Sequence, residues 1–132
     1  MGMLLVRSGQ KLPTLVVCSS ALRARSTLDI ALRAGGWSPE VVFSDALYAS
    51  SAEKVLSLLR ELPDAHDRVM LVGHEPTWSD LARRFCGGRV RMPTAGMARF
   101  DFQALTWRDL AFDEGELIWL LQPSFFRKFR YS

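Results

Sequence analysis

The sequence contains very little cysteine and histidine. It has two of each among 132 residues, and Cys18 and Cys86 lie far apart with no second Cys or His at metal-ligand spacing. This scarcity argues against a zinc site, any other metal cofactor and a disulfide-stapled scaffold. We therefore expect a protein without cofactors in a reducing, cytoplasmic location.

Long apolar runs and a strong charge bias are also missing. The longest apolar stretches, such as residues 117–121, fall far short of the ~20 residues that a membrane span needs. The net charge of +3 is a mild bias toward anionic ligands and is well short of a nucleic-acid signature. We expect partners to include neither a membrane nor nucleic acid, and the length predicts one domain over residues 1–132.

Strand and helix patterns alternate along the first two thirds of the chain. Helical stripes run from about Ser20 to Gly35-Gly36, from the capping box Ser50-x-x-Glu53 to Pro63, and from Pro76 to Gly87-Gly88. Short apolar runs typical of strands precede them at residues 14–18, 41–43 and 69–72. Three strand-then-helix units predict a parallel α/β sheet.

The last third predicts a strand meander at the sheet edge, with strands at residues 97–102, 106–112 and 116–122 and a turn at 113–115. The predicted fold class is therefore α/β in three layers, a mostly parallel sheet with helices on both faces and antiparallel C-terminal strands. The tail, residues 124–131, interleaves aromatics with cations. We interpret it as a docked segment with solvated cations rather than as a patch for anionic surfaces.

Two junctions between a predicted strand and the following helix carry candidate ligand-binding residues. Arg23 stands in the first turn of a helix, and His74 stands just before the N-terminus of another. Ligands of open α/β sheets bind beyond the carboxyl ends of the strands, where helix N-termini favour anions. If these strands are neighbours, Arg23 and His74 converge on one anion, for which phosphate is the natural guest. Taken singly, a histidine at a strand end is more often structural and an arginine in a first turn is often only solvated, but the pair at matching junctions favours a functional role.

A cysteine-phosphatase loop is a weaker alternative at the first junction. That loop needs five residues between Cys and Arg, whereas Cys18 and Arg23 have four between them and no glycine. We interpret Cys18 as a small buried hydrophobic residue.

Three segments together resemble the histidine phosphatase superfamily, specifically its short SixA-like phosphohistidine phosphatase branch with a phosphoglycerate mutase-like fold. They are residues 15–27 (LVVCSSALRARST), 45–48 (DALY) and 72–76 (VGHEP), and the resemblance runs from about Leu12 to Pro123. In that family a histidine in an Arg-His-Gly or Arg-His-Ala motif on the first strand is phosphorylated as the nucleophile. Its phosphoryl group is held by two arginines and a second histidine, and a carboxylate often acts as the acid.

The resemblance implies roles for particular residues. By position, Arg23 is the second arginine and His74 the second histidine, so both are expected to be catalytic and, with Ser19, phosphate-binding. Asp45 or Glu75 is the candidate acid. No metal is implied, and phosphorylated protein or a small phosphoester is the implied substrate.

The nucleophilic histidine of the family has no counterpart in this sequence. The other histidine, His66, is expected to be a solvated loop residue at the amino end of a strand. Arg7-Ser8-Gly9 resembles the motif, but the link from it to the strand at Thr14 is too short for a parallel crossover. It allows only a hairpin, which would place Ser8 a strand's length from Arg23. We therefore match residues 4–9 to the end of the family's first helix. By this interpretation the chain is N-terminally truncated, and the neighbours of the missing strand are left unpaired, pair with each other or pair with a second copy.

The predicted function is phosphohistidine phosphatase-like hydrolysis through a phosphohistidine intermediate, impaired because the nucleophile is absent. The main alternative is a non-catalytic module that binds phosphate or a phosphoprotein. A third is an interaction domain that uses Trp37, Trp78, Trp107 and Trp119. The sequence also leaves open whether the chain forms a homodimer.

Overall fold

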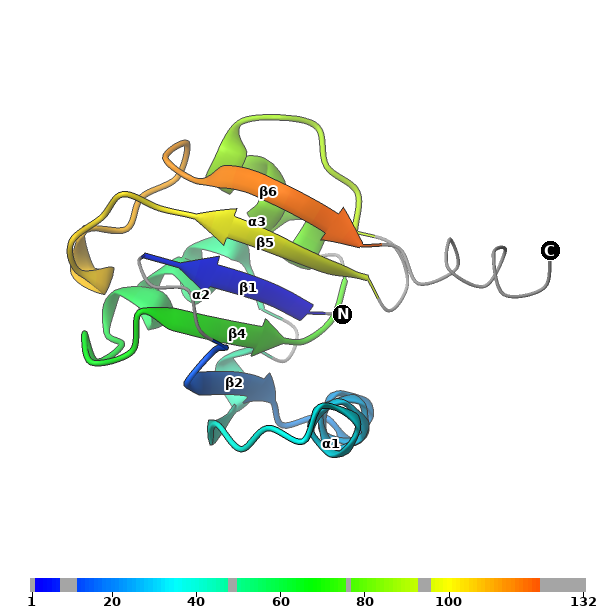
Figure 1. Ribbon diagram of the computed structural model, residues 1–132. Helices are drawn as coiled ribbons and strands as arrows, with labels where there is room; N and C mark the ends of the chain where they lie inside the picture. Colours follow the sequence, from blue (N-terminus) through cyan, green and yellow to red (C-terminus); the bar gives the residue numbers. More distant parts are fainter. Residues whose placement is uncertain (1, 8–11, 48–49, 76, 93–95, 122–132) are drawn as a thin grey trace, which may run out of the picture.

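The computed structural model describes residues 2–7, 12–47, 50–75, 77–92 and 96–121. In these residues a six-stranded mixed sheet has the order β3-β2-β4-β1-β5-β6 and is covered by α1 on one face and by α2 and α3 on the other (Figure 1). The predicted three-layer α/β architecture is confirmed. The elements are β1 (Gly2–Val6), β2 (Leu15–Ser19), α1 (Leu22–Gly35), β3 (Glu40–Ser44), η1 (Asp45–Leu47), α2 (Ala52–Arg60), β4 (Arg68–Val72), α3 (Thr77–Cys86), β5 (Met97–Asp101), η2 (Trp107–Asp109) and β6 (Glu116–Leu121).

The alternating segments fold as their patterns predict. All five residues of β2 are buried, because side chains on both faces of this strand meet a helix layer. Helix α1 ends at Gly36, which adopts the left-handed conformation at φ 59°, as the paired glycines predict. Gly87 closes α3 in the same way at φ 75°. Helix α1 buries Ala24 and Leu28 against the sheet.

Two details of the predicted elements are wrong. The N-cap of α2 is Ser51, whose side chain accepts from the N–H of Lys54 at 3.3 Å, so the capping residue is one position later than the Ser50 box predicts. Residues 106–112 form no strand but the 3-10 turn η2. Trp107 draws this segment inward, because its ring is fully buried and its indole N–H donates to the carbonyl of His66 at 2.7 Å.

Strand β1 contradicts the expected helix end and the expected gap in the sheet. It pairs antiparallel with β4 and parallel with β5, so it fills the position between them. Met3 and Leu5 enter the core on the α2–α3 side, and Leu4 and Val6 are buried on the other face. The ladder bonds of two flanking strands and burial on both faces outweigh the local helical pattern.

Strands β1 and β2 run in opposite directions, as in the hairpin considered for the short link between them, but they are not neighbours. Strand β4 lies between β1 and β2, so the two do not pair. Val6 is the partner of Arg68 at the start of β4, which places the following Arg7 at the amino end of β4. Ser8 lies outside the described residues, as do Tyr48, Pro76 and the tail at 124–131.

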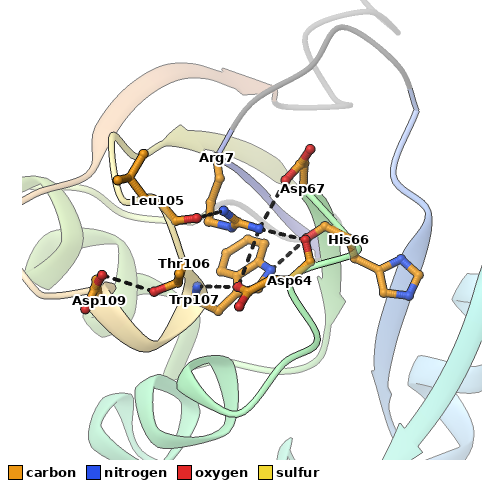
Figure 2. A network of polar contacts seen from close by, with 8 residues as sticks. All are labelled: Arg7, Asp64, His66, Asp67, Leu105, Thr106, Trp107 and Asp109. Atoms are coloured by element: carbon orange, nitrogen blue, oxygen red, sulfur yellow. Dashed lines mark hydrogen bonds and ion pairs between the residues drawn. The ribbon is translucent and has the colours of Figure 1, made fainter.

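Arg7 anchors β1 to the loop before β4 (Figure 2). Its Nη2 donates to the carbonyl of Asp64 and to the Asp67 carboxylate, both at 3.1 Å, and its Nη1 donates to the carbonyl of Leu105. The guanidinium lies 5.0 Å from the centre of the Trp107 ring. Only 6% of the side chain is exposed, so Arg7 has a structural role.

His66 is not the solvated loop residue expected from the sequence. Its Nδ1 lies 2.6 Å from Thr14 Oγ1 and its Nε2 lies 3.2 Å from Glu40 Oε2. Since Thr14 precedes β2 and Glu40 begins β3, the imidazole ties three adjacent strand starts together. The expected position at the amino end of β4 is correct.

We predict that Arg7→Ala lowers the free energy of unfolding by about 2 kcal/mol, because it removes charged hydrogen bonds and the packing over Trp107. Urea denaturation followed by circular dichroism measures the change. The matched control is Arg33→Ala, whose side chain is 80% exposed and pairs with Asp29 one helical turn away; it is expected to cost at most about 0.5 kcal/mol. Equal losses in the two variants would contradict the anchoring role.

Candidate functional site

The site lies where β2, β3 and β4 end. These three strands are parallel, with Cys18 the partner of Val72 and Ser19 the partner of Ser44. Their carboxyl ends therefore meet at one edge of the sheet, as Figure 1 shows for β2 and β4. This register brings the two predicted junctions, β2 to α1 and β4 to α3, onto neighbouring strands.

The β2–α1 junction leaves a helix N-terminus open to an anion. Ala21 is the N-cap of α1 and offers no side-chain cap, and the first turn of α1 has no acidic residue. Arg23 is the second residue of α1 and is exposed. A guanidinium beside uncapped backbone N–H groups forms a concentration of positive potential.

Ser19 shapes this junction from within. It is fully buried, and its Oγ accepts from the N–H of Ala21 at 3.3 Å, which fixes the turn that leads into α1. A direct contact between Ser19 and phosphate stays a prediction. Cys18 is also fully buried, and burial raises the pKa of its thiol, with the Arg25 guanidinium acting in the opposite direction. These properties agree with the interpretation of Cys18 as a packing residue and disfavour a thiolate nucleophile.

The β4–α3 junction requires glycine at position 73. A Cβ on Gly73 would lie 2.7 Å from Cζ2 of Trp78, and Trp78 is fully buried in the α2–α3 core. Close packing of the indole on the backbone fixes the turn from which His74 projects. His74 is half-buried and its Nε2 is inaccessible to solvent.

The two candidate acids have different surroundings. Asp45 begins η1 at the end of β3 and accepts a hydrogen bond from the hydroxyl of Ser20, so it is tied to the same junction as Arg23. Glu75 accepts from the backbone N–H of Ser79 at 2.7 Å and from the Ser79 hydroxyl. Both bonds require an acceptor, so Glu75 serves as a cap for the first turn of α3.

A ring contact joins the end of β3 to the start of α1. The Arg25 guanidinium lies 4.4 Å from the centre of the Phe43 ring. Since Arg25 is two residues beyond Arg23, the first turn of α1 lies beside the carboxyl end of β3. The structure places the two junctions at the same end of neighbouring strands. The close association of the Arg23 and His74 side chains on one anion stays a prediction.

Three of the four tryptophans have structural contacts. Trp78 and Trp107 are fully buried and Trp37 donates from its indole to the carbonyl of Pro13 at 2.8 Å, which disfavours an interaction surface built on tryptophans. Within the described part of the chain no group of three or more His, Cys, Asp or Glu side chains could hold a metal ion. In the same residues, no helix has both the length and the apolar character of a membrane span.

Sequence reasoning missed the Arg7 network and the clamp made by His66. In the sequence, Arg7 is a single charge after an apolar run. Its resemblance to the arginine of the family's Arg-His-Gly motif gives no indication that it is a buried anchor. Nothing in the local sequence of Pro63-Asp64-Ala65-His66-Asp67 identifies its distant partners Arg7, Thr14 and Glu40.

Comparison with known proteins bears on the fold. No family model matches the chain. An uncharacterized protein of Mycobacterium leprae (strain TN), ML1117, is 28% identical over 113 residues, which span 78% of this chain and 67% of that protein.

Two solved structures have the same fold. One, from Nakamurella multipartitia, is assigned as a phosphohistidine phosphatase SixA; it has a TM-score of 0.72 and 25% identity, covering 83% of this chain and 70% of its own. The other, from Agrobacterium tumefaciens and assigned likewise, has a TM-score of 0.70 and 23% identity, covering 92% and 97%.

The fold is therefore that of the histidine phosphatase superfamily, in its phosphoglycerate mutase-like form. Together with the three motifs, this likeness supports placing the chain beside the SixA-like branch of that superfamily. This similarity supports a histidine phosphatase-like function.

We predict that Gly73→Ala destabilises the fold by about 1 to 3 kcal/mol, because the new methyl group collides with the indole of Trp78. Thermal and urea unfolding measure the loss. Gly88→Ala is the matched control, since among the described residues a Cβ there meets Cys86 Sγ alone, at the ordinary contact distance of 3.7 Å, and we expect a change within about 0.5 kcal/mol. A neutral Gly73→Ala would show that the junction has room to relax.

Proposed function

We propose that the carboxyl edge of β2, β3 and β4 binds the phosphoryl group of a phosphorylated protein. The observation that carries this proposal is the parallel register of β2 with β4, which sets the Arg23 and His74 junctions side by side. In this arrangement the Arg23 guanidinium holds two phosphoryl oxygens, the N–H groups at the start of α1 add donors, and His74 hydrogen-bonds a further oxygen.

Phosphohistidine on a protein is the proposed substrate class, with small phosphomonoesters as the broader set. The fold shared with structures assigned as phosphohistidine phosphatases supports this choice. Asp45 is the preferred acid, because its hydrogen bond to Ser20 ties it to the Arg23 junction, whereas Glu75 is used as a helix cap. Cytoplasmic location is also proposed, in keeping with the free thiols of Cys18 and Cys86.

Hydrolysis through a phosphohistidine intermediate is proposed to be impaired in this chain. Its two histidines are His66 and His74, and His66 stands before the start of β4, a full strand away from the candidate edge. The position beside the end of β4 is taken by Gly2, the partner of Val72. Loss of a nucleophile costs on the order of 10^5 to 10^6 in rate.

The same observation favours a second candidate function, non-catalytic recognition of a phosphorylated partner. Arg23 and His74 bind charge and do not require a nucleophile to do so. Binding and turnover must therefore be measured separately.

We predict that Arg23→Ala weakens binding of inorganic phosphate at least about tenfold, because it removes a bidentate charged contact. Isothermal titration measures the affinity. Arg33→Ala, near the other end of α1, removes the same charge from the same helix and is expected to leave the affinity unchanged. Absence of phosphate binding by the unaltered chain, or equal affinities in the two variants, would refute the site.

We further predict negligible hydrolysis of a chromogenic phosphomonoester by this chain. Robust turnover that is lost in His74→Ala and kept in His66→Ala would show that the candidate site is catalytically complete. It would contradict the proposal that hydrolysis is impaired. Negligible turnover with retained phosphate binding supports the binding function.

A further inference from the structure

Strand β3 is the outermost strand on one side of the sheet, and its carboxyl end lies at the candidate phosphate site. In the described residues it pairs with β2 alone. Natural edge strands are commonly protected by lysine, proline or a bulge, but β3 reads Glu-Val-Val-Phe-Ser and keeps an unbroken register with β2. Val42 and Phe43 are 44% and 45% exposed.

The outward hydrogen-bonding groups of β3 can be assigned. The N–H of Glu40 donates to the carbonyl of Thr14 at 3.0 Å, which places Glu40 toward β2. Because successive residues of a strand direct their backbone groups to opposite sides, Val41 and Phe43 present their N–H and C=O groups at the open edge. These groups form a template for another extended segment.

An apolar pocket of about 220 Å³ borders this edge on the α2 side. The residues that make it apolar come from β2, β3, α2 and the segment after α2, and they include Leu15, Val17, Val42, Leu58, Leu62 and Pro63. Side-chain pockets beside an open strand edge supply specificity when a peptide is added as a further strand. The volume suits one large aliphatic or aromatic side chain.

The far end of β3 reaches the phosphate site. Ser44 is followed by Asp45, which is bonded to Ser20, and Arg25 of α1 stacks over Phe43. A segment laid along β3 therefore runs from the apolar pocket toward the turn that bears Arg23.

We propose, on the basis of the proposed function, that the phosphorylated partner binds as an extended segment along β3. It places an apolar side chain in the pocket beside α2 and its phosphorylated residue at Arg23. A second copy of this chain fits less well. Antiparallel self-pairing about Val42 sets Glu40 of each copy opposite Ser44 of the other. It brings no phosphoryl group to Arg23, so the positively charged end of the surface would be left without a complementary charge.

The probes are short fluorescent peptides of alternating Thr and Leu that carry a stable phosphohistidine analogue at one end. One set carries the analogue at the N-terminus and the other at the C-terminus, so that binding parallel and antiparallel to β3 are both tested. Companion peptides are N-methylated at alternate amides, which removes the donors that pair with an edge strand. In at least one direction we expect the unmodified peptide to bind roughly tenfold more tightly than its companion by fluorescence anisotropy.

Val42→Lys tests the edge in the protein. It places a charge beside the pocket, and we expect it to reduce peptide affinity to that of the N-methylated companion. The matched control is Ile118→Lys on β6, the opposite edge strand, where the replaced side chain is 41% exposed; its peptide affinity is expected to be unchanged. Inorganic phosphate binding should be kept in both variants, which shows that they fold and that the phosphate site is intact.

The possible failures are distinguishable. Equal binding of both peptides, or full peptide affinity in Val42→Lys, overturns docking on β3 while phosphate binding still supports the proposed function. Loss of phosphate binding in the unaltered chain removes the proposed function itself. A dimer in sedimentation analysis that Val42→Lys dissociates without weakening peptide binding identifies a second copy as the occupant and overturns the proposal.

Discussion

Strand β4 determines the arrangement of the whole molecule. It pairs parallel with β2 on one side and antiparallel with β1 on the other, and its residues enter both hydrophobic cores, Val69 and Leu71 beneath α2 and α3, Met70 and Val72 beneath α1. The parallel pairing with β2 aligns the two junctions of the candidate site. The antiparallel pairing with β1 sends Arg7 to the other end of the sheet, so that anchoring and ligand binding are separated by the length of a strand.

The sequence predicts those elements whose patterns depend on local chemistry. The apolar run of β2, the glycine at the end of α1 and the alternating burial along β5 are all visible in short windows. The common edge for Arg23 and His74 also follows from sequence, because parallel strands connected by helices direct all of their carboxyl ends the same way.

The errors lie where distant partners decide the conformation. Residues 2–6 have no turn or cap that identifies them as a strand, and their structure is set by β4 and β5, which come more than sixty residues later. The segment that begins at residue 106 has a strand-like pattern but forms no strand, because the buried indole of Trp107 donates a hydrogen bond to the carbonyl of His66. In both cases long-range pairing and burial exceed a local preference that is worth less than about 1 kcal/mol per residue.

The starts of the three described helices explain why the candidate site lies at α1. Helix α2 is capped by Ser51 and has Glu53 in its first turn, while α3 has Asp80 and the carboxylate of Glu75. Helix α1 has Ala21 as its N-cap, no acid in its first turn and Arg23 there instead. A missing side-chain cap costs about 1 kcal/mol and a misplaced cation ~0.3 to 1 kcal/mol. A phosphate dianion reverses both costs, so the helix that is least stable at its N-terminus alone is the one best suited to hold such a ligand.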